Sequence, residues 1–252
     1  MHSRRPWCVK IRNRALNNGE APTQLALSVG LRDDATFDNF YPGASGNALA
    51  LQATEGLAEG VGEPYLYLWG ESGAGCSHLL QAACHRAAEH GRQSLYLPLA
   101  QVRAYGPELL QGLEGLDLVC LDQLQSVVGD PLWEEALFHC YNRLRDSGTG
   151  LLIAADRPAR QLSVALADLA SRLSWGVVFN LQALQDDAKV AALRLRARGR
   201  GFDLSEEMAL FILHRSPRRM NELFALLDRL DQASLSAKRK ITIPFIKTTL
   251  GW

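Results

Sequence analysis

YLYLWGESGAGCSHLLQAACHRAAEHG, residues 65–91, is the stretch that decides the fold of this 252-residue chain. It begins with five apolar or aromatic residues, passes through a loop with glycine at 70, 73 and 75, and continues as a helical pattern that stops at Gly91. This order predicts a buried strand, a tight loop and a covering helix. Backbone N–H groups at the start of such a helix point into the loop, so the unit is suited to bind phosphate.

The rest of the chain repeats this alternation of strand and helix. Further buried strands are predicted at residues 94–99, 116–122, 150–156 and 175–181. Helices are predicted at 131–148, where proline stands at the start and glycine near the end, and at 166–173. After residue 181 only helical patterns remain. We therefore expect an α/β fold with a five-stranded parallel sheet, followed by a small C-terminal helical domain.

Composition excludes several classes of protein. With 47% hydrophobic and 21% charged residues, the chain can form a substantial core. It has no apolar run of membrane-spanning length and no apolar segment typical of a secretion signal, which predicts a cytoplasmic protein without membrane contact. The five cysteines are scattered and form no CxxC pair, so reduced, mostly buried thiols are expected and no zinc site.

The charge is unevenly distributed along the chain. Basic and acidic residues number 27 each, but residues 1–19 hold five basic residues and no acidic one. The remainder therefore has five more acidic than basic residues. Such a body lacks the broad basic surface of a DNA-binding domain, so direct sequence-specific DNA binding is not expected.

The glycine loop has the spacing of a Walker A motif, but one residue departs from it. Cys76 stands where active ATPases have the lysine that reaches the β- and γ-phosphates. Phosphate binding can persist on backbone donors, whereas stabilisation of charge at the γ-phosphate should be weakened. We expect a bound diphosphate and weak or absent intrinsic ATPase activity. The residues expected to hold the nucleotide here are Gly70, Ser72, Gly73, Ala74, Gly75, Cys76, Ser77 and His78.

Asp122 ends the predicted strand at 116–122, at the position of a Walker B acid. Together with Ser77 it could hold Mg²⁺, although a strand-end turn is an alternative role for this carboxylate. Gln123 follows where many ATPases have a carboxylate base, and an amide cannot act as a general base. This position also favours a protein that does not turn over ATP.

Several segments together resemble a known family. The stretches ATFDNFYPGASGNALALQA and SPRRMNEL resemble boxes of DnaA, the bacterial replication initiator. The resemblance to the Hda group of DnaA-related AAA+ regulators is closer and runs from about residue 24 to residue 252. It is carried in chain order by QLALSVGL, DDATFDNFYPG, GAGCSHLLQAAC, GDPLWEEALFHCYNRL, DRPARQL, DLASRLSWG, LRARGRGF and KRKITIPF. It implies an AAA+ P-loop core at 31–181 and a helical lid at 182–252, preceded by a clamp-binding peptide at 24–30. Residues 1–23 show no sustained period and end in an Asn/Gly/Pro cluster, which predicts a flexible N-terminal extension.

The resemblance also implies roles for individual residues. Arg172 corresponds to an arginine finger that acts in trans on DnaA, with a surface salt bridge as the alternative. Arg218 corresponds to the sensor 2 arginine, with neighbouring Arg219 as the alternative. Asp156 occupies the sensor 1 position or caps a helix. Phe40 and Tyr41, on the segment that includes Asn47, are expected near the nucleotide base or in the core.

The clamp-binding peptide is represented by Gln24, Leu25, Leu27 and Val29. By resemblance, the protein is expected to bind ADP or another nucleoside diphosphate, with or without Mg²⁺. It would act with the sliding clamp (β subunit) of DNA polymerase III, loaded on DNA, to stimulate ATP hydrolysis by DnaA and so prevent re-initiation of replication. An active ATPase of the helicase-loader type and a structural adaptor with an empty loop are the alternatives. Whether the chain forms a homodimer or higher oligomer is left open.

Overall fold

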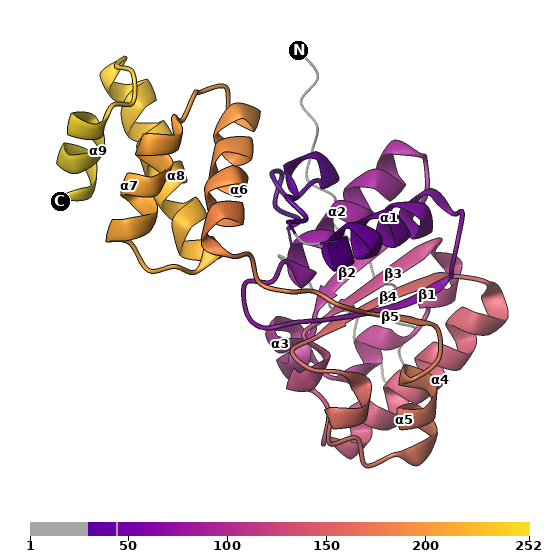
Figure 1. The fold of residues 1–252 in the computed structure, drawn as a ribbon. Coiled ribbons are helices and arrows are strands. Elements are labelled where there is room, and N and C mark those ends of the chain that lie inside the picture. Colours follow the sequence, from indigo (N-terminus) through magenta and orange to yellow (C-terminus); the bar gives the residue numbers. More distant parts are fainter. Residues whose placement is uncertain (1–29, 44) are drawn as a thin grey trace, which may run out of the picture.

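The computed structural model describes residues 30–43 and 45–252 of the chain (Figure 1). The predicted extension at 1–23 and the predicted clamp-binding residues Gln24, Leu25, Leu27 and Val29 lie outside this described part. No helix within the described part is long and apolar enough to cross a membrane.

The core of the protein is a five-stranded sheet in which all neighbouring strands are parallel. Its order is β2-β3-β4-β1-β5, so β1 lies between β4 and β5 although it comes first in the chain. This confirms the predicted α/β fold. The strand bounds are β1 (Tyr65–Trp69), β2 (Ser94–Pro98), β3 (Leu118–Asp122), β4 (Gly150–Ala155) and β5 (Val177–Asn180).

Helices cover both faces of the sheet (Figure 1). Residues of α1 (Ser45–Glu59) and α2 (Cys76–Glu89) pack with one face in a single apolar cluster. The second cluster joins the other face to α3 (Leu99–Val102), α4 (Pro131–Ser147) and α5 (Ala167–Leu173). Because β3 and β4 are covered on both sides, all their residues are buried, as their continuous apolar sequences predict.

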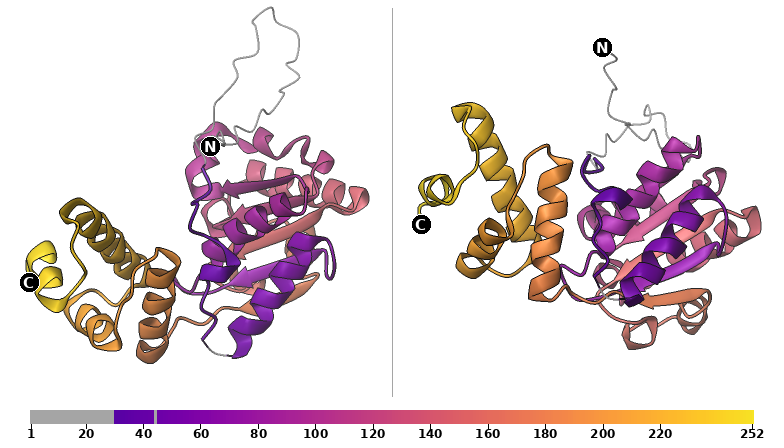
Figure 2. Two further views of the ribbon diagram at one scale, coloured as in Figure 1. Left: turned by 90° about the horizontal axis from the view of Figure 1, so that it is seen from above. Right: turned by 45° about the horizontal axis from the view of Figure 1, so that its top comes forward.

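The C-terminal part is a separate helical domain with its own apolar core. Its helices are α6 (Asp186–Gly199), α7 (Glu206–Arg215), α8 (Met220–Ala237) and α9 (Ile243–Leu250). Both views in Figure 2 show these helices standing beside the sheet layers, next to the segment at residues 30–43. The segment joins the two parts: Arg196 of α6 donates to the carbonyl oxygen of Asp34 at 2.7 Å and pairs with its carboxylate.

A buried asparagine fixes the chain where it leaves the sheet. Asn47 of α1 donates to the carbonyl oxygen of Gln182 and accepts from its N–H, both at 2.9 Å. Asn47 is 1% exposed, so this pair of hydrogen bonds satisfies a polar side chain that would be costly to bury alone. It holds the linker to the helical domain against α1.

Two features differ from the sequence interpretation. The strand at 175–181 was expected to be buried, but β5 is shorter and lies at an edge of the sheet, where Val178 is 43% exposed. The prediction of burial was wrong because an apolar run does not reveal its place in the strand order. Helix α1 was not predicted, since two glycines and a run of small residues in its sequence weaken the helical pattern.

Candidate functional site

The glycine loop lies between the carboxyl end of β1 and the start of α2, beside the end of β4. The N–H of Gly70 donates to the carbonyl oxygen of Ala155 at 3.3 Å. A Cβ at Gly70 would lie 2.5 Å from the carbonyl oxygen of Leu181, so only glycine fits there. Gly73 and Gly75 have φ angles of +91° and +107°, which other residues rarely adopt. The glycines are therefore required by the shape of the loop.

Helix α2 begins without a side chain that caps it. Its N-cap is Gly75, no side-chain hydrogen bond closes the first turn, and no acidic residue lies in that turn. The N–H groups of Cys76, Ser77 and His78 therefore face the loop together with the positive end of the helix dipole. A phosphate group is the kind of acceptor that such an arrangement fits.

Cys76 adds no charge to this site. Burial raises the pKa of its thiol to about 12, and the nearby carboxylate of Asp122 contributes to this rise. The thiol is thus protonated at neutral pH. The loop has only dipoles where a lysine would bring a full positive charge.

Asp122 is held at the end of β3 by two donors. The hydroxyl of Tyr96 donates to Oδ2 at 2.7 Å, and the N–H of Gln123 donates to Oδ1 at 2.9 Å. Asp122 is 2% exposed, so these bonds fix its orientation. Each carboxylate oxygen keeps one lone pair. The free carboxylate oxygen sites of Asp122 and the hydroxyl of Ser77 are oxygen ligands of the kind that suits Mg²⁺. This ion takes one or two protein ligands and completes its octahedron with water and phosphate.

Two side chains pack beside the loop: Phe40, from the segment at residues 30–43, and His78, from the first turn of α2. Nε2 of His78 lies 2.7 Å from the carbonyl oxygen of Thr36, so it carries the proton and donates. Burial lowers the pKa of His78 to about 4, which keeps the ring neutral at neutral pH. The ring of Phe40 stands 5.6 Å from that of His78, and its edge would lie 2.7 Å from a Cβ on Gly75.

Phe40 and Tyr41 point in different directions. Phe40 is 9% exposed and belongs to the apolar cluster around α2, whereas Tyr41 packs against the core of the helical domain. The pair thus joins the two domains next to the loop. Their predicted contact with a nucleotide base stays a prediction.

The candidates for sensor 1 and sensor 2, Asp156 and Arg218, are each paired with a charged neighbour. Asp156 follows β4 and forms two hydrogen bonds of 2.8 Å with the guanidinium of Arg157, which lower the pKa of this carboxyl. Arg218 precedes α8 and binds Asp186, at the start of α6, at 2.8 Å. The alternative, Arg219, lies 3.9 Å from Glu222. A phosphate would have to compete with these partners, and the sensor roles stay predictions.

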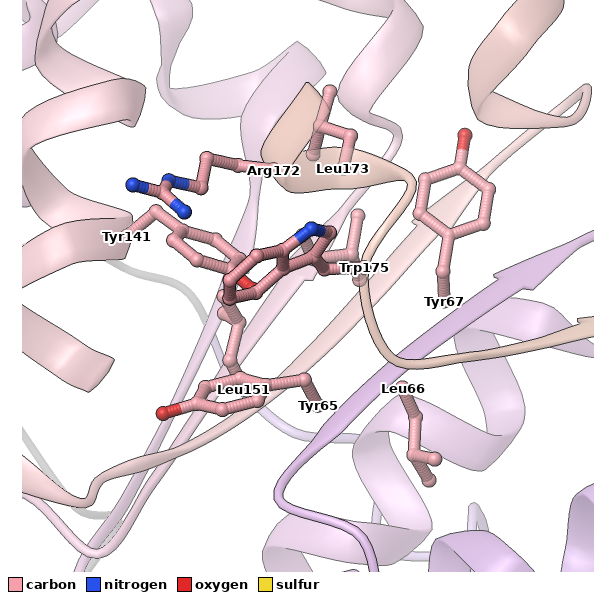
Figure 3. A pocket seen from close by; sticks show the side chains of 9 residues that line it. Tyr65, Leu66, Tyr67, Tyr141, Leu151, Arg172, Leu173 and Trp175 are labelled. Atoms are coloured by element: carbon pink, nitrogen blue, oxygen red, sulfur yellow. The ribbon is translucent and has the colours of Figure 1, made fainter. Parts of the chain in front are cut away.

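Arg172 lies beside Tyr141 and Trp175 (Figure 3), at the end of the sheet where β1 begins and not at the end that carries the loop. It comes from α5 and lines a shallow pocket with Tyr65, the first residue of β1. The loop begins after Trp69, the last residue of that strand. Four residue steps along a strand span about 13 Å, so the guanidinium of Arg172 is far from its own phosphate loop.

A buried glutamate holds the start of α5. Glu134 of α4 is 1% exposed, and its carboxylate accepts from the N–H groups of Gly129 at 2.8 Å, Ala165 at 2.9 Å and Leu166 at 2.8 Å. These bonds fix the entry to the helix that carries Arg172.

Two family models match the chain over adjacent parts. The model described as bacterial DnaA ATPase domain matches residues 31–180, which is more than half of the chain. The chain belongs to the bacterial DnaA ATPase-domain family. The model described as Hda, lid domain, matches residues 186–250, so the DnaA-type core is followed by a helical domain of the Hda type.

Solved structures agree with this DnaA-type fold. Domain III of DnaA from Thermotoga maritima superposes with a TM-score of 0.73 at 23% identity, over 88% of this chain and 98% of that one. AMPPCP-bound DnaA from Aquifex aeolicus gives 0.66 at 23% identity, over 82% of this chain and 68% of that one. A RuvB variant from Thermotoga maritima superposes with a TM-score of 0.61 at 15% identity, over 86% of this chain and 73% of that one. At these identities the likeness shows the fold alone.

Sequence reasoning missed three residues that support the candidate site. Tyr96 and Glu134 act through partners 26 and 31 residues away, and Trp175, within the quoted DLASRLSWG box, was given no role. A tyrosine on a buried strand and a glutamate on an amphipathic helix give no signal of such partners. For Trp175 the signal was present, because it lies three residues after Arg172.

Proposed function

We propose that this protein is a nucleoside diphosphate-bound regulator of DnaA. With the sliding clamp loaded on DNA, it would stimulate hydrolysis of the ATP bound to DnaA and so limit re-initiation of chromosome replication. One observation carries the proposal. Arg172 lies a strand length away from its own phosphate loop, and within the described part of the chain its side chain contacts an aromatic ring and pairs with no carboxylate.

The loop supports the nucleotide part of the proposal. The N–H groups at the start of α2 would bind the diphosphate, and Ser77 and Asp122 would hold Mg²⁺, which would neutralise phosphate charge. Neutral Cys76 offers no positive charge to a γ-phosphate, and Gln123 offers no carboxylate base. These two residues favour retention of a diphosphate over turnover. The AMPPCP-bound DnaA of Aquifex aeolicus is an example of a related fold with nucleotide present.

Arg172 would act in the active site of the partner. A guanidinium supplied across a subunit boundary stabilises the charge that develops on the transferred phosphoryl group, an effect of about 10³–10⁵ in rate for arginine fingers. Among residues 30–43 and 45–252 no carboxylate pairs with this side chain, so it would bring its charge without first leaving an ion pair there. The clamp contact is assigned to Gln24, Leu25, Leu27 and Val29 on the resemblance alone.

The central experiment measures hydrolysis of DnaA-bound ATP in the presence of clamp loaded on DNA. Arg172→Ala should abolish stimulation while clamp binding in a pull-down is unchanged. Arg103→Ala is the matched control, because Arg103 is an exposed arginine of the same domain that pairs with Asp130 at 3.7 Å. Unchanged stimulation by Arg172→Ala would refute the proposed role.

Two further measurements test the other parts. The purified protein should retain a nucleoside diphosphate and hydrolyse ATP at a negligible rate, whereas robust turnover by the protein alone would favour the helicase-loader alternative. A Gln24→Ala, Leu27→Ala double variant should lose clamp binding. Retained binding would place the clamp contact elsewhere.

A further inference from the structure

The guanidinium of Arg172 rests against the indole ring of Trp175. Its Cζ lies 4.9 Å from the ring centroid, and no carboxylate within the described ranges pairs with it. Figure 3 shows both side chains close to Tyr141, and all three line the pocket with Tyr65, the first residue of β1. Trp175 is 53% exposed, so burial alone does not explain its position.

The backbone fixes the position of this indole relative to α5. The N–H of Trp175 donates to the carbonyl oxygen of Arg172 at 3.0 Å, which closes a turn directly after the helix. Gly176 follows with a φ of +84°, and a Cβ there would lie 2.4 Å from the carbonyl oxygen of Tyr65. The glycine therefore lets the chain pass close to β1, and the indole is set beside the arginine by the turn itself.

An aromatic partner has a different effect on arginine from that of a carboxylate. The ring attracts the cation through its quadrupole and restricts a long, flexible side chain, but it leaves the positive charge uncompensated. A carboxylate would bind more strongly, and its negative charge would neutralise much of the positive potential that the guanidinium presents to another group. An arginine that must act on an external phosphate is better prepared by an aromatic ring.

We infer that Trp175 is a positioning residue that holds the guanidinium of Arg172 in place, with its positive charge not neutralised, until a phosphate of a partner protein arrives. This inference rests on the proposed function. It assigns to Trp175 an effect on the maximal stimulated rate, because ordering the guanidinium in advance lowers the cost of placing it at the transition state.

The test uses the stimulation assay with three replacements of Trp175. Trp175→Phe and Trp175→Tyr keep an aromatic face and should keep most of the activity. Trp175→Leu keeps apolar bulk without that face, and should lower the maximal rate about fivefold, the factor that a cation–π contact at a half-exposed site supplies. The concentration that gives half-maximal stimulation should stay the same. Tyr105→Leu is the control, since Tyr105 is 50% exposed and lies in another part of the surface.

Three results would overturn the inference. Full activity of Trp175→Leu while Arg172→Ala is inactive would remove the role of Trp175 but leave the proposed function intact. A raised half-maximal concentration with an unchanged maximal rate would make Trp175 a contact with the partner instead. Equal losses in the leucine, phenylalanine and tyrosine variants, with clamp binding and thermal stability unchanged, would show that the aromatic face is irrelevant. If Arg172→Ala itself stimulates normally, the proposed function fails first.

Discussion

Replacement of Glu134 by glutamine should destabilise the protein strongly although it changes only one functional group. The carboxylate accepts from three backbone N–H groups, and both oxygens are used. Oε1 accepts from Gly129, Oε2 accepts from Leu166, and the N–H of Ala165 is shared between Oε2 at 2.9 Å and Oε1 at 3.2 Å. Glutamine keeps one oxygen, but its NH₂ group faces N–H donors on the other side. At least one of the three N–H groups then loses its acceptor, and the remaining bonds lose their charge.

The size of the effect follows from these contacts. Hydrogen bonds to charged groups contribute about 1.5–3 kcal/mol each, and an unsatisfied buried donor costs about 1–3 kcal/mol. Because the bonds on one oxygen survive in weakened form, we expect the free energy of unfolding to fall by about 2–5 kcal/mol. The start of α5 should loosen first, since two of the three donors precede that helix.

Urea unfolding followed by circular dichroism measures the loss, and hydrogen exchange of peptides from α5 locates it. Glu135→Gln is the matched control, because the neighbouring side chain is 69% exposed and lies 3.8 Å from His139. That control should change stability by less than about 0.5 kcal/mol. If Glu134→Gln and Glu135→Gln have the same unfolding midpoint and the same exchange in α5, the carboxylate does not hold this helix.

Three further predictions concern the phosphate loop. Cys76→Lys should tighten ADP binding in calorimetry by about 10- to 100-fold, because a charge-assisted contact contributes about 1.5–3 kcal/mol. Cys76→Ser is the control and should leave the affinity unchanged. Equal affinities of the two variants for ADP would contradict our account of the loop. Gly75→Ala should destabilise by at least about 1 kcal/mol more than Gly73→Ala. Both glycines have positive φ, but only at Gly75 would the new Cβ meet an aromatic ring, at 2.7 Å. His78 has its pKa lowered from 6.5 to about 4. Between these two pH values the imidazole is protonated in the unfolded chain but neutral in the folded protein. Stability should therefore fall as pH drops from 6.5 towards 4, by at most about 3 kcal/mol, and a His78→Gln variant should show a shallower pH profile in denaturant titrations.

The sequence by itself determined most of the elements and the phosphate loop. The strand of residues 65–69 is found as predicted, and the predicted helix after the loop is α2, which runs from Cys76 to Glu89. The four helices of the C-terminal domain also follow from local patterns. These features could be predicted because strand runs, helical periodicity, glycine spacing and helix stops are properties of neighbouring residues.

Tertiary structure alone decided how these elements meet. Parallel pairing placed β5 at an edge and exposed Val178, and it brought Tyr96 of β2 within reach of Asp122 on β3. It also separated Arg172 from the loop by the length of β1. Such contacts join residues tens of positions apart, and they depend on strand order and register. The amino-acid pattern of one segment contains no information on the segment that will lie beside it, and this is why the loop was evident from sequence but the surroundings of its carboxylate and of the arginine were not.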